Sequence, residues 1–276
     1  HEMWRHFAKR GIYPDSPMLQ RCRADLLEVY CSQNSALTEQ ANQKGLWAER
    51  HGLNDGDLST WEGRHKLYDR LLQLRPRNIW MSPRCKAWCR WNEFNRHKTQ
   101  ELANRIMTAR QEDQVHLLLC DALFQFQTCW SHLCHAHLEQ PVGSQMLYQE
   151  ELAAVVDQSW IGRCDMCTAG RLKHPQTQNH LQKGTQILTT SEVMHRQVTN
   201  LRCTRDHVHD HVEGSCFVPQ LGRINVSQYT ELYTRVFANK MVRSMQCSAQ
   251  VSEVNCRPTE NALVTRSTDE DRKSVV

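Results

Sequence analysis

Short apolar segments alternate with segments of helical spacing along the first part of this chain. The runs 24–31, 45–50 and 79–81 have the length and apolar content of buried strands, and helical patterns at 32–44 and 61–74 separate them. Strands and helices that alternate in this way favour a parallel sheet with right-handed crossovers. We therefore expect an α/β fold with a doubly wound, mainly parallel sheet.

The same alternation continues in the second half. A helical pattern without Pro or Gly covers 96–130, and a strand-like run at 135–141 ends at a proline. We predict a helix at 148–158, a strand rich in β-branched residues at 185–191 and an amphipathic closing helix at 227–245. One series of strands and helices thus extends over most of the chain.

The length of 276 residues fits one large α/β domain with flanking segments. We expect an N-terminal extension at 1–20, a domain at 21–248 and a disordered tail at 249–276, where the sequence turns polar. Within the domain, 162–216 is rich in Cys and His and is a candidate insert.

Composition points to an intracellular protein. No stretch approaches the roughly 20 apolar residues that cross a bilayer, and the opening residues lack the apolar core of a secretory signal. The thirteen cysteines are odd in number, which favours reduced thiols over a disulfide scaffold. We expect a nuclear or cytoplasmic protein without a membrane partner. The net charge of +4 is compatible with a polyanionic partner but does not identify one, and the oligomeric state stays open.

Polar and reactive residues follow three of the predicted strands. They lie in 30–35 after the first strand, in 82–85 after the third, and in 137–141 at the end of the fourth. Ligands of open α/β sheets bind at the carboxyl ends of the strands. These three segments are therefore the first candidates for a functional site.

The order of these motifs resembles that of the DNA cytosine-5 methyltransferases. A strand is followed by a Pro-x-Cys turn, a long helix and a strand that ends in Glu-x-Pro, and the resemblance covers about 24–245. It implies a class I, Rossmann-like methyltransferase fold that binds S-adenosylmethionine. It also implies that Cys85 attacks carbon 6 of a flipped-out cytosine, while Glu139 hydrogen-bonds the base.

Each catalytic candidate also has a simpler interpretation. A thiolate is the active nucleophile, and Arg84, Lys86 and Arg90 around Cys85 are expected to lower the pKa of its thiol. Cys85 is otherwise a small buried residue, and Glu139 a strand-end carboxylate paired with a neighbouring His or Lys. A later basic residue, for which Lys183 is the candidate here, contacts the base carbonyl or a phosphate in the family that the motifs resemble.

The resemblance also assigns cofactor-binding roles. The turn after the first strand takes the place of the glycine-rich family motif but contains no glycine, and Arg84 replaces the second proline of the Pro-Pro-Cys turn. These departures are typical of a diverged or inactive enzyme. Small or acidic residues near strand ends are candidates to hold S-adenosylmethionine, or else are helix caps and turn residues. The candidates are Ser32, Asn34, Ser35, Glu49, Asp57 and Ser82.

A Cys-x-x-Cys pair and a later Cys and His cluster form a second constellation. Cys164, Cys167, Cys203 and His207 have the ligand types of a tetrahedral zinc site. The alternatives are a reduced cluster without metal and a redox-active Cys-x-x-Cys.

The resemblance thus implies methyl transfer from S-adenosylmethionine to cytosine in DNA. Two other functions remain open. One is a catalytically inactive, methyltransferase-like nucleic-acid-binding module from a mobile-element polyprotein, with zinc as a candidate ligand. The other is a small-molecule or RNA methyltransferase on the same fold. Trp88 and Trp91 are candidates for substrate contact, because aromatic rings stack on flipped bases.

Overall fold

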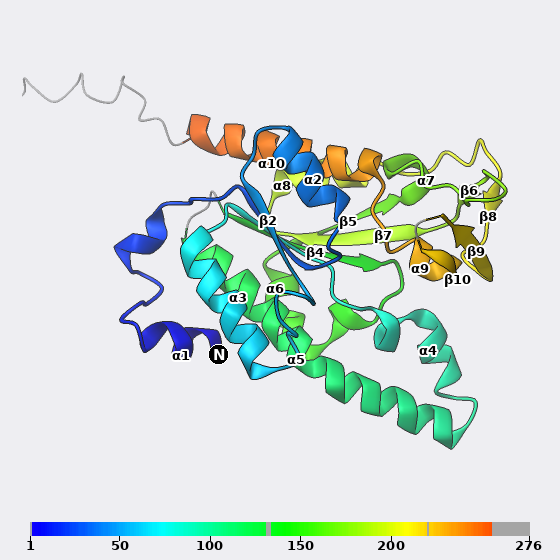
Figure 1. Ribbon diagram of the computed structural model, residues 1–276, viewed down its shortest axis with the longest axis horizontal. Coiled ribbons are helices and arrows are strands. Elements are labelled where there is room, and N and C mark those ends of the chain that lie inside the picture. Colours follow the sequence, from blue (N-terminus) through cyan, green and yellow to red (C-terminus); the bar gives the residue numbers. More distant parts are fainter. Residues whose placement is uncertain (1, 131–133, 220, 256–276) are drawn as a thin grey trace, which may run out of the picture.

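A mixed, mostly parallel sheet lies between two layers of helices (Figure 1). The computed structural model describes residues 2–130, 134–219 and 221–255. Within these ranges, six strands form the main sheet in the order β2-β1-β3-β4-β7-β5. Helices α2, α8 and α10 cover one face, and α3, α5 and α6 cover the other. The α/β class and the mainly parallel sheet expected from the sequence are confirmed.

The first half consists of regular strand and helix units. Its main elements are β1 (Leu26–Cys31), α2 (Ala36–Gln43), β2 (Ala48–Gly52), α3 (Trp61–Leu74), β3 (Asn78–Met81), α4 (Arg90–Asn95), α5 (Gln100–Trp130) and β4 (His135–Pro141). They are preceded by α1 (Glu2–Ala8) and the 3-10 helix η1 (Pro17–Gln20), and the 3-10 helix η2 (Lys86–Trp88) lies between β3 and α4. Each strand and helix predicted in this half is present, with ends shifted by a few residues.

The second half has shorter elements. They are η3 (Met146–Tyr148), η4 (Glu150–Leu152), α6 (Ala153–Asp157), β5 (Trp160–Asp165), α7 (Met166–Ala169), β6 (His180–Leu181), β7 (Gly184–Thr189), α8 (Glu192–Thr199), β8 (His209–Asp210), β9 (Ser215–Val218), β10 (Gly222–Asn225), α9 (Val226–Tyr229) and α10 (Arg235–Asn255). The helix predicted at 148–158 is α-helical only over α6, and the closing helix is divided into α9 and α10.

Strand direction distinguishes the two sides of the sheet. β1 pairs in parallel with β2 and with β3, and β3 pairs in parallel with β4. β7 then runs antiparallel to both β4 and β5. Because β2 and β3 lie on opposite sides of β1, the strand order reverses there. The carboxyl ends of β1 and β3 therefore border a switch point, where open α/β sheets bind their ligands.

Alternating side chains explain why this sheet needs helices on both faces. Leu27 and Ile79 are fully buried in the core shared with α3 and α5. Leu26 and Trp80 lie in the separate core shared with α2 and α10. Because successive side chains of a strand point to opposite faces, apolar runs such as Leu26–Cys31 are stable only between two apolar layers.

The structure adds detail to the expected domain boundaries. The expected extension at 1–20 contains α1, whose Met3 and Phe7 are fully buried in the core. The range 162–216 contributes β7 and most of β5 to the main sheet. α10 continues through Asn255, so the first part of the expected tail is helical, whereas 256–276 lie outside the described residues. Among the described helices, none is long and apolar enough to cross a membrane.

A fully buried histidine links three strands at the centre of the sheet. His137 on β4 is within 2.8 Å of the Thr189 hydroxyl on β7 through Nδ1, and within 3.1 Å of the Asn78 side-chain oxygen on β3 through Nε2. Burial, reinforced by nearby His135, lowers the pKa of His137 well below its ordinary value. The ring is therefore a neutral donor and acceptor in the folded protein.

This burial predicts a loss of stability in acid. The unfolded chain binds a proton at His137 as pH falls below about 6.5, whereas the folded chain resists it, so the free energy of unfolding should fall by up to about 1.4 kcal/mol per pH unit. Urea unfolding between pH 8 and pH 5 should show a shallower decline for His137→Gln than for wild type. The control is His97→Gln, since the side chain of His97 is 70% exposed. Equal slopes for wild type and His137→Gln would contradict the assignment.

Candidate functional site

The ends of β3 and β4 lie side by side at the edge where ligands are expected. Met81 pairs with Leu138, so the next residues, Ser82 and Glu139, lie at the same level of the sheet. The backbone N–H of Ser82 also donates to the carbonyl of Val29 on β1, at 3.3 Å. Parallel pairing thus brings together three segments that are distant in the sequence.

Cys85 lies in the turn between β3 and η2 and is half-buried. Burial raises the pKa of its thiol to about 11, and the carboxylate of Glu139 adds to this rise, while Lys183 opposes it. The three predicted catalytic residues therefore influence one another electrostatically. The expectation that neighbouring basic residues lower the pKa of this thiol is wrong, because desolvation dominates and Arg84 is exposed to solvent.

Glu139 is a buried acid with few polar partners. Only 9% of the residue is exposed, and burial raises the pKa of its carboxyl group, opposed by the charge of Lys183. The hydroxyl of Tyr233 donates to Glu139 Oε2 at 3.5 Å. A carboxyl group in this environment favours its protonated form more than an exposed one does.

Tyr233 is a site residue that the sequence did not reveal. Its hydroxyl lies 2.5 Å from the Ser82 hydroxyl and accepts a hydrogen bond from the indole N–H of Trp80 at 3.0 Å. Tyr233 lies just before α10, about 150 positions after β3 in the chain, and no spacing rule connects it to the strand ends. Ser82, predicted to bind cofactor, instead belongs to this network beside Glu139.

Lys183 lies beside the end of β4, on the side away from β3, because β7 pairs with β4 there. It lies between β6 and β7, and its Nζ donates to the carbonyl of Thr230 at 2.6 Å. Its charge acts on both Cys85 and Glu139. Lys183 therefore lies close enough to both groups for its charge to lower their pKa values.

The turn after β1 is organised by a buried carboxylate. Glu28 is 1% exposed, and it accepts hydrogen bonds from the hydroxyls of Ser35 and Thr38 at 2.6 Å and from the backbone N–H of Thr38 at 3.2 Å. Ser35 also caps α2 by accepting from the N–H of Leu37. The Ser35 side chain is therefore committed to the fold, whereas Ser32 and Asn34 are exposed.

Two hollows lie beside this turn. The smaller holds about 140 Å³ at the ends of β1 and β2, where Ser32, Gly52 and Asp55 are among its lining residues. The larger, of about 850 Å³, is open to solvent and is lined in part by Asn34 and Glu49. Small-molecule pockets usually hold about 300–1,000 Å³. The volume of the smaller hollow is below this range, and the larger hollow is too open to solvent to surround a ligand.

The two acidic cofactor candidates already have partners. Glu49 forms an ion pair with Arg70 and accepts a hydrogen bond from the indole of Trp47 at 3.0 Å. Asp57 accepts hydrogen bonds from the N–H and hydroxyl of Ser59 in the turn before α3, and these lower the pKa of its carboxyl group. Neither of the two hollows is lined by Asp57.

The tryptophans near Cys85 have different environments. Trp88 is 3% exposed and belongs to the core, so its predicted role in substrate contact is not supported. Trp91 is 74% exposed on α4. Of the two, only Trp91 is free to meet a ligand.

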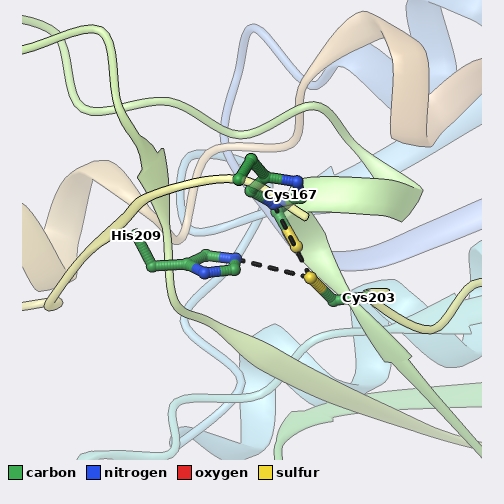
Figure 2. A group of neighbouring side chains, drawn as sticks. Cys167, Cys203 and His209 are labelled. Carbon is green, nitrogen blue, oxygen red and sulfur yellow. Dashed lines mark hydrogen bonds between the residues drawn. The ribbon is translucent and has the colours of Figure 1, made fainter. Parts of the chain in front are cut away.

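Cys167, Cys203, His207 and His209 bring their ligand atoms together, all within 4.8 Å of one another. The Cys203 sulfur lies 3.6 Å from His207 Nε2 and 3.5 Å from His209 Nε2. Figure 2 shows the Cys203 thiol directed toward Cys167 and His209. The residue types and the convergence fit a metal ion with soft and borderline ligands.

This cluster differs from the predicted zinc set at one position. Cys164 is 1% exposed on β5 and packs in the core with α10, so it does not join the cluster. His209 takes its place. His209 was visible in the sequence as part of an alternating series of histidines, but only the fold shows which of them faces Cys203.

Comparison with known protein families, with curated protein sequences and with solved structures finds no match to this chain.

The electrostatics at Cys85 predict its reactivity. Alkylation by iodoacetamide, followed at the Cys85 peptide by mass spectrometry, should accelerate with pH toward a pKa of about 11. At pH 9, Glu139→Gln should raise the rate by roughly three- to ten-fold because it removes a negative charge, and Lys183→Met should lower it by a similar factor. Exposed Glu150→Gln is the control. Unchanged rates in both site variants would show that these charges do not act on Cys85.

Proposed function

We propose that this protein transfers a methyl group from S-adenosylmethionine to cytosine in DNA, with Cys85 as the nucleophile. The observation that carries the proposal is that β3 and β4 end side by side, which puts the Cys85 turn next to Glu139, and that the charges of Glu139 and Lys183 act on Cys85. A thiol, a buried carboxyl group and an ammonium group at one sheet edge form a combination that polarises and attacks a flipped base.

The topology supports this proposal. The parallel order β2-β1-β3-β4, with helices on both faces, is compatible with a Rossmann-like fold of the class I methyltransferase type. In such a fold the cofactor lies at the switch point next to β1. The hollow at the ends of β1 and β2 adjoins that point, and the candidate site lies beyond it at β3 and β4.

The groups beside the switch point fit part of the cofactor. Ser32 and Asn34 present exposed polar side chains, and Asp55 lines the smaller hollow with a carboxylate suited to ribose hydroxyls. A side chain at Gly52 would come within 2.5 Å of the carbonyl oxygen of Cys31, so glycine permits the close approach of the β1 and β2 ends. When bound, S-adenosylmethionine supplies an electrophilic methyl group.

The raised pKa of Glu139 suits its part in nucleophilic addition to cytosine. In the proposed reaction the Cys85 sulfur, as thiolate, bonds to carbon 6 of the base. Glu139, whose pKa is raised by burial, would donate from its protonated form to ring nitrogen 3 and disperse the negative charge. Carbon 5 then takes the methyl group and loses its proton to solvent, and the departing sulfur restores the aromatic ring.

A second candidate function is a catalytically inactive module that binds nucleic acid. Two observations favour it: the Ser35 hydroxyl is committed to Glu28, and burial raises the pKa of the Cys85 thiol to about 11, which leaves little thiolate at neutral pH. Such a module would bind DNA or RNA without forming a covalent bond to it.

Covalent trapping distinguishes the two functions. With S-adenosylmethionine and an oligonucleotide containing 5-fluorocytosine, wild type should form a denaturation-resistant adduct, because fluorine cannot leave carbon 5 as a proton does. Cys85→Ala should form none, and Glu139→Gln should slow adduct formation by roughly 10²–10³-fold. The matched control is Cys89→Ala, since Cys89 is also half-buried and lies beside η2.

Two results would contradict methyl transfer. One is an adduct that persists in Cys85→Ala. The other is the absence of S-adenosylmethionine binding, measured by calorimetry on well-folded wild type. Oligonucleotide binding without an adduct would favour the inactive module.

A further inference from the structure

The structure assigns a four-coordinate Zn²⁺ site to Cys167, Cys203, His207 and His209, and this site fixes the segment that carries Lys183. The site is separate from Cys85 and does not depend on the proposed methyl transfer.

The spacing of the ligand atoms matches zinc geometry. Zn–S bonds of about 2.3 Å and Zn–N bonds of about 2.0–2.1 Å at a tetrahedral angle put a sulfur and a nitrogen about 3.6 Å apart. Cys203 Sγ lies 3.6 Å from Nε2 of His207 and 3.5 Å from Nε2 of His209. These two sulfur–nitrogen pairs therefore already stand at the separation that a shared zinc ion requires, and all four ligand atoms lie within 4.8 Å of one another.

The surroundings orient the ligands. Asp206 lies 2.7 Å from Nδ1 of His207 and, by accepting a hydrogen bond there, leaves the Nε2 lone pair directed at Cys203. Histidines that bind zinc commonly donate their second ring N–H to a carboxylate, which orients the ring. The N–H of Arg205 donates to the sulfur of Cys203 at 3.2 Å, and Asp165 accepts from the N–H of Cys203 at 2.9 Å.

Four protein ligands leave no open coordination position. Such sites are structural, whereas catalytic zinc sites keep one position for water or substrate. Two thiolates and two imidazoles also favour Zn²⁺ over Mg²⁺ or Ca²⁺, which prefer oxygen ligands. The assigned role is therefore to hold chain segments together.

Lys183 lies between the segments that the metal would join. Its carbonyl accepts from the N–H of Met166 at 2.8 Å, next to Cys167. The neighbouring Gln182 donates its N–H to the carbonyl of Asp210 at 2.9 Å, next to His209. One ion bound to both Cys167 and His209 would thus hold together the two segments that hydrogen-bond Lys183 and Gln182.

Metal content and spectroscopy test the site. The 276-residue chain should retain about one zinc, and replacement by Co²⁺ should give intense tetrahedral visible bands with thiolate-to-metal charge transfer. Cys203→Ser and His209→Ala should lose the metal, and Asp206→Asn should weaken Zn²⁺ affinity by roughly 10–100-fold. Cys164→Ala and His211→Ala are matched controls and should keep both metal and spectrum.

Circular dichroism of each variant, and the Co²⁺ spectrum of wild type itself, separate loss of the site from loss of the fold. Folded wild type that binds neither Zn²⁺ nor Co²⁺ stoichiometrically would overturn the assignment. A Cys167–Cys203 disulfide in protein prepared under reducing conditions would also overturn it, as would metal loss in His211→Ala with retention in His209→Ala.

The link to Lys183 has its own readout. Lys183 lowers the pKa of the Cys85 thiol, so chelation of zinc should loosen Lys183 and slow alkylation at the Cys85 peptide. The rate should fall by roughly three- to ten-fold, as in Lys183→Met. An unchanged rate in folded, metal-free protein would overturn the claim that the metal fixes this segment.

Discussion

Parallel pairing of β1, β3 and β4 is the constraint on which the candidate active site depends. Three strands that run in one direction must end at one edge, and this brings the turn after β1, the Cys85 turn and Glu139 together. The pairing is enforced by burial on both faces, because Leu27 and Trp80 belong to cores on opposite sides of the sheet. A shift of one residue in register would exchange these faces and separate Ser82 from Glu139.

Desolvation at this edge then determines the chemistry of its side chains. Burial is the largest cause of the raised pKa values of Cys85, Glu139 and Tyr233, so each neutral form is favoured more than it would be in water. A neutral carboxyl group can donate a hydrogen bond, which suits Glu139 for contact with a ring nitrogen. A neutral thiol is a poor nucleophile. Burial therefore favours the proposed role of Glu139 and opposes that of Cys85. The charge of Lys183 acts against burial, because it lowers the pKa of the Cys85 thiol.

The sequence predicted the parts of the fold that periodicity encodes and missed those that it does not. Apolar runs identified β1 and β3, since a strand buried on both faces has few polar residues, and β4 was predicted from a strand-like run that ends at a proline. The antiparallel direction of β7 depends on the path of the chain between strands, and no sequence pattern predicts it. Cys85 and Glu139 were predicted from their places at strand ends and, together with Lys183, from the resemblance in motif order, and their roles stay predictions. Tyr233 was not, because it reaches Glu139 only through tertiary packing of the segment before α10.

The metal ligands, too, could be predicted only in part from the sequence, and their positions bear on Lys183. Residue type selected Cys167, Cys203 and His207, which the fold brings together, but spacing alone could not separate Cys164, which points into the core from β5, from Cys167 on the first turn of α7. Once these segments are placed, His209 completes the set, and the bonds from Met166 and Gln182 join it to Lys183. Lys183 is the one cation whose charge acts on both Cys85 and Glu139 among the causes resolved for the described residues. A metal ion bound at this cluster would therefore influence Cys85 and Glu139 by holding that cation in place.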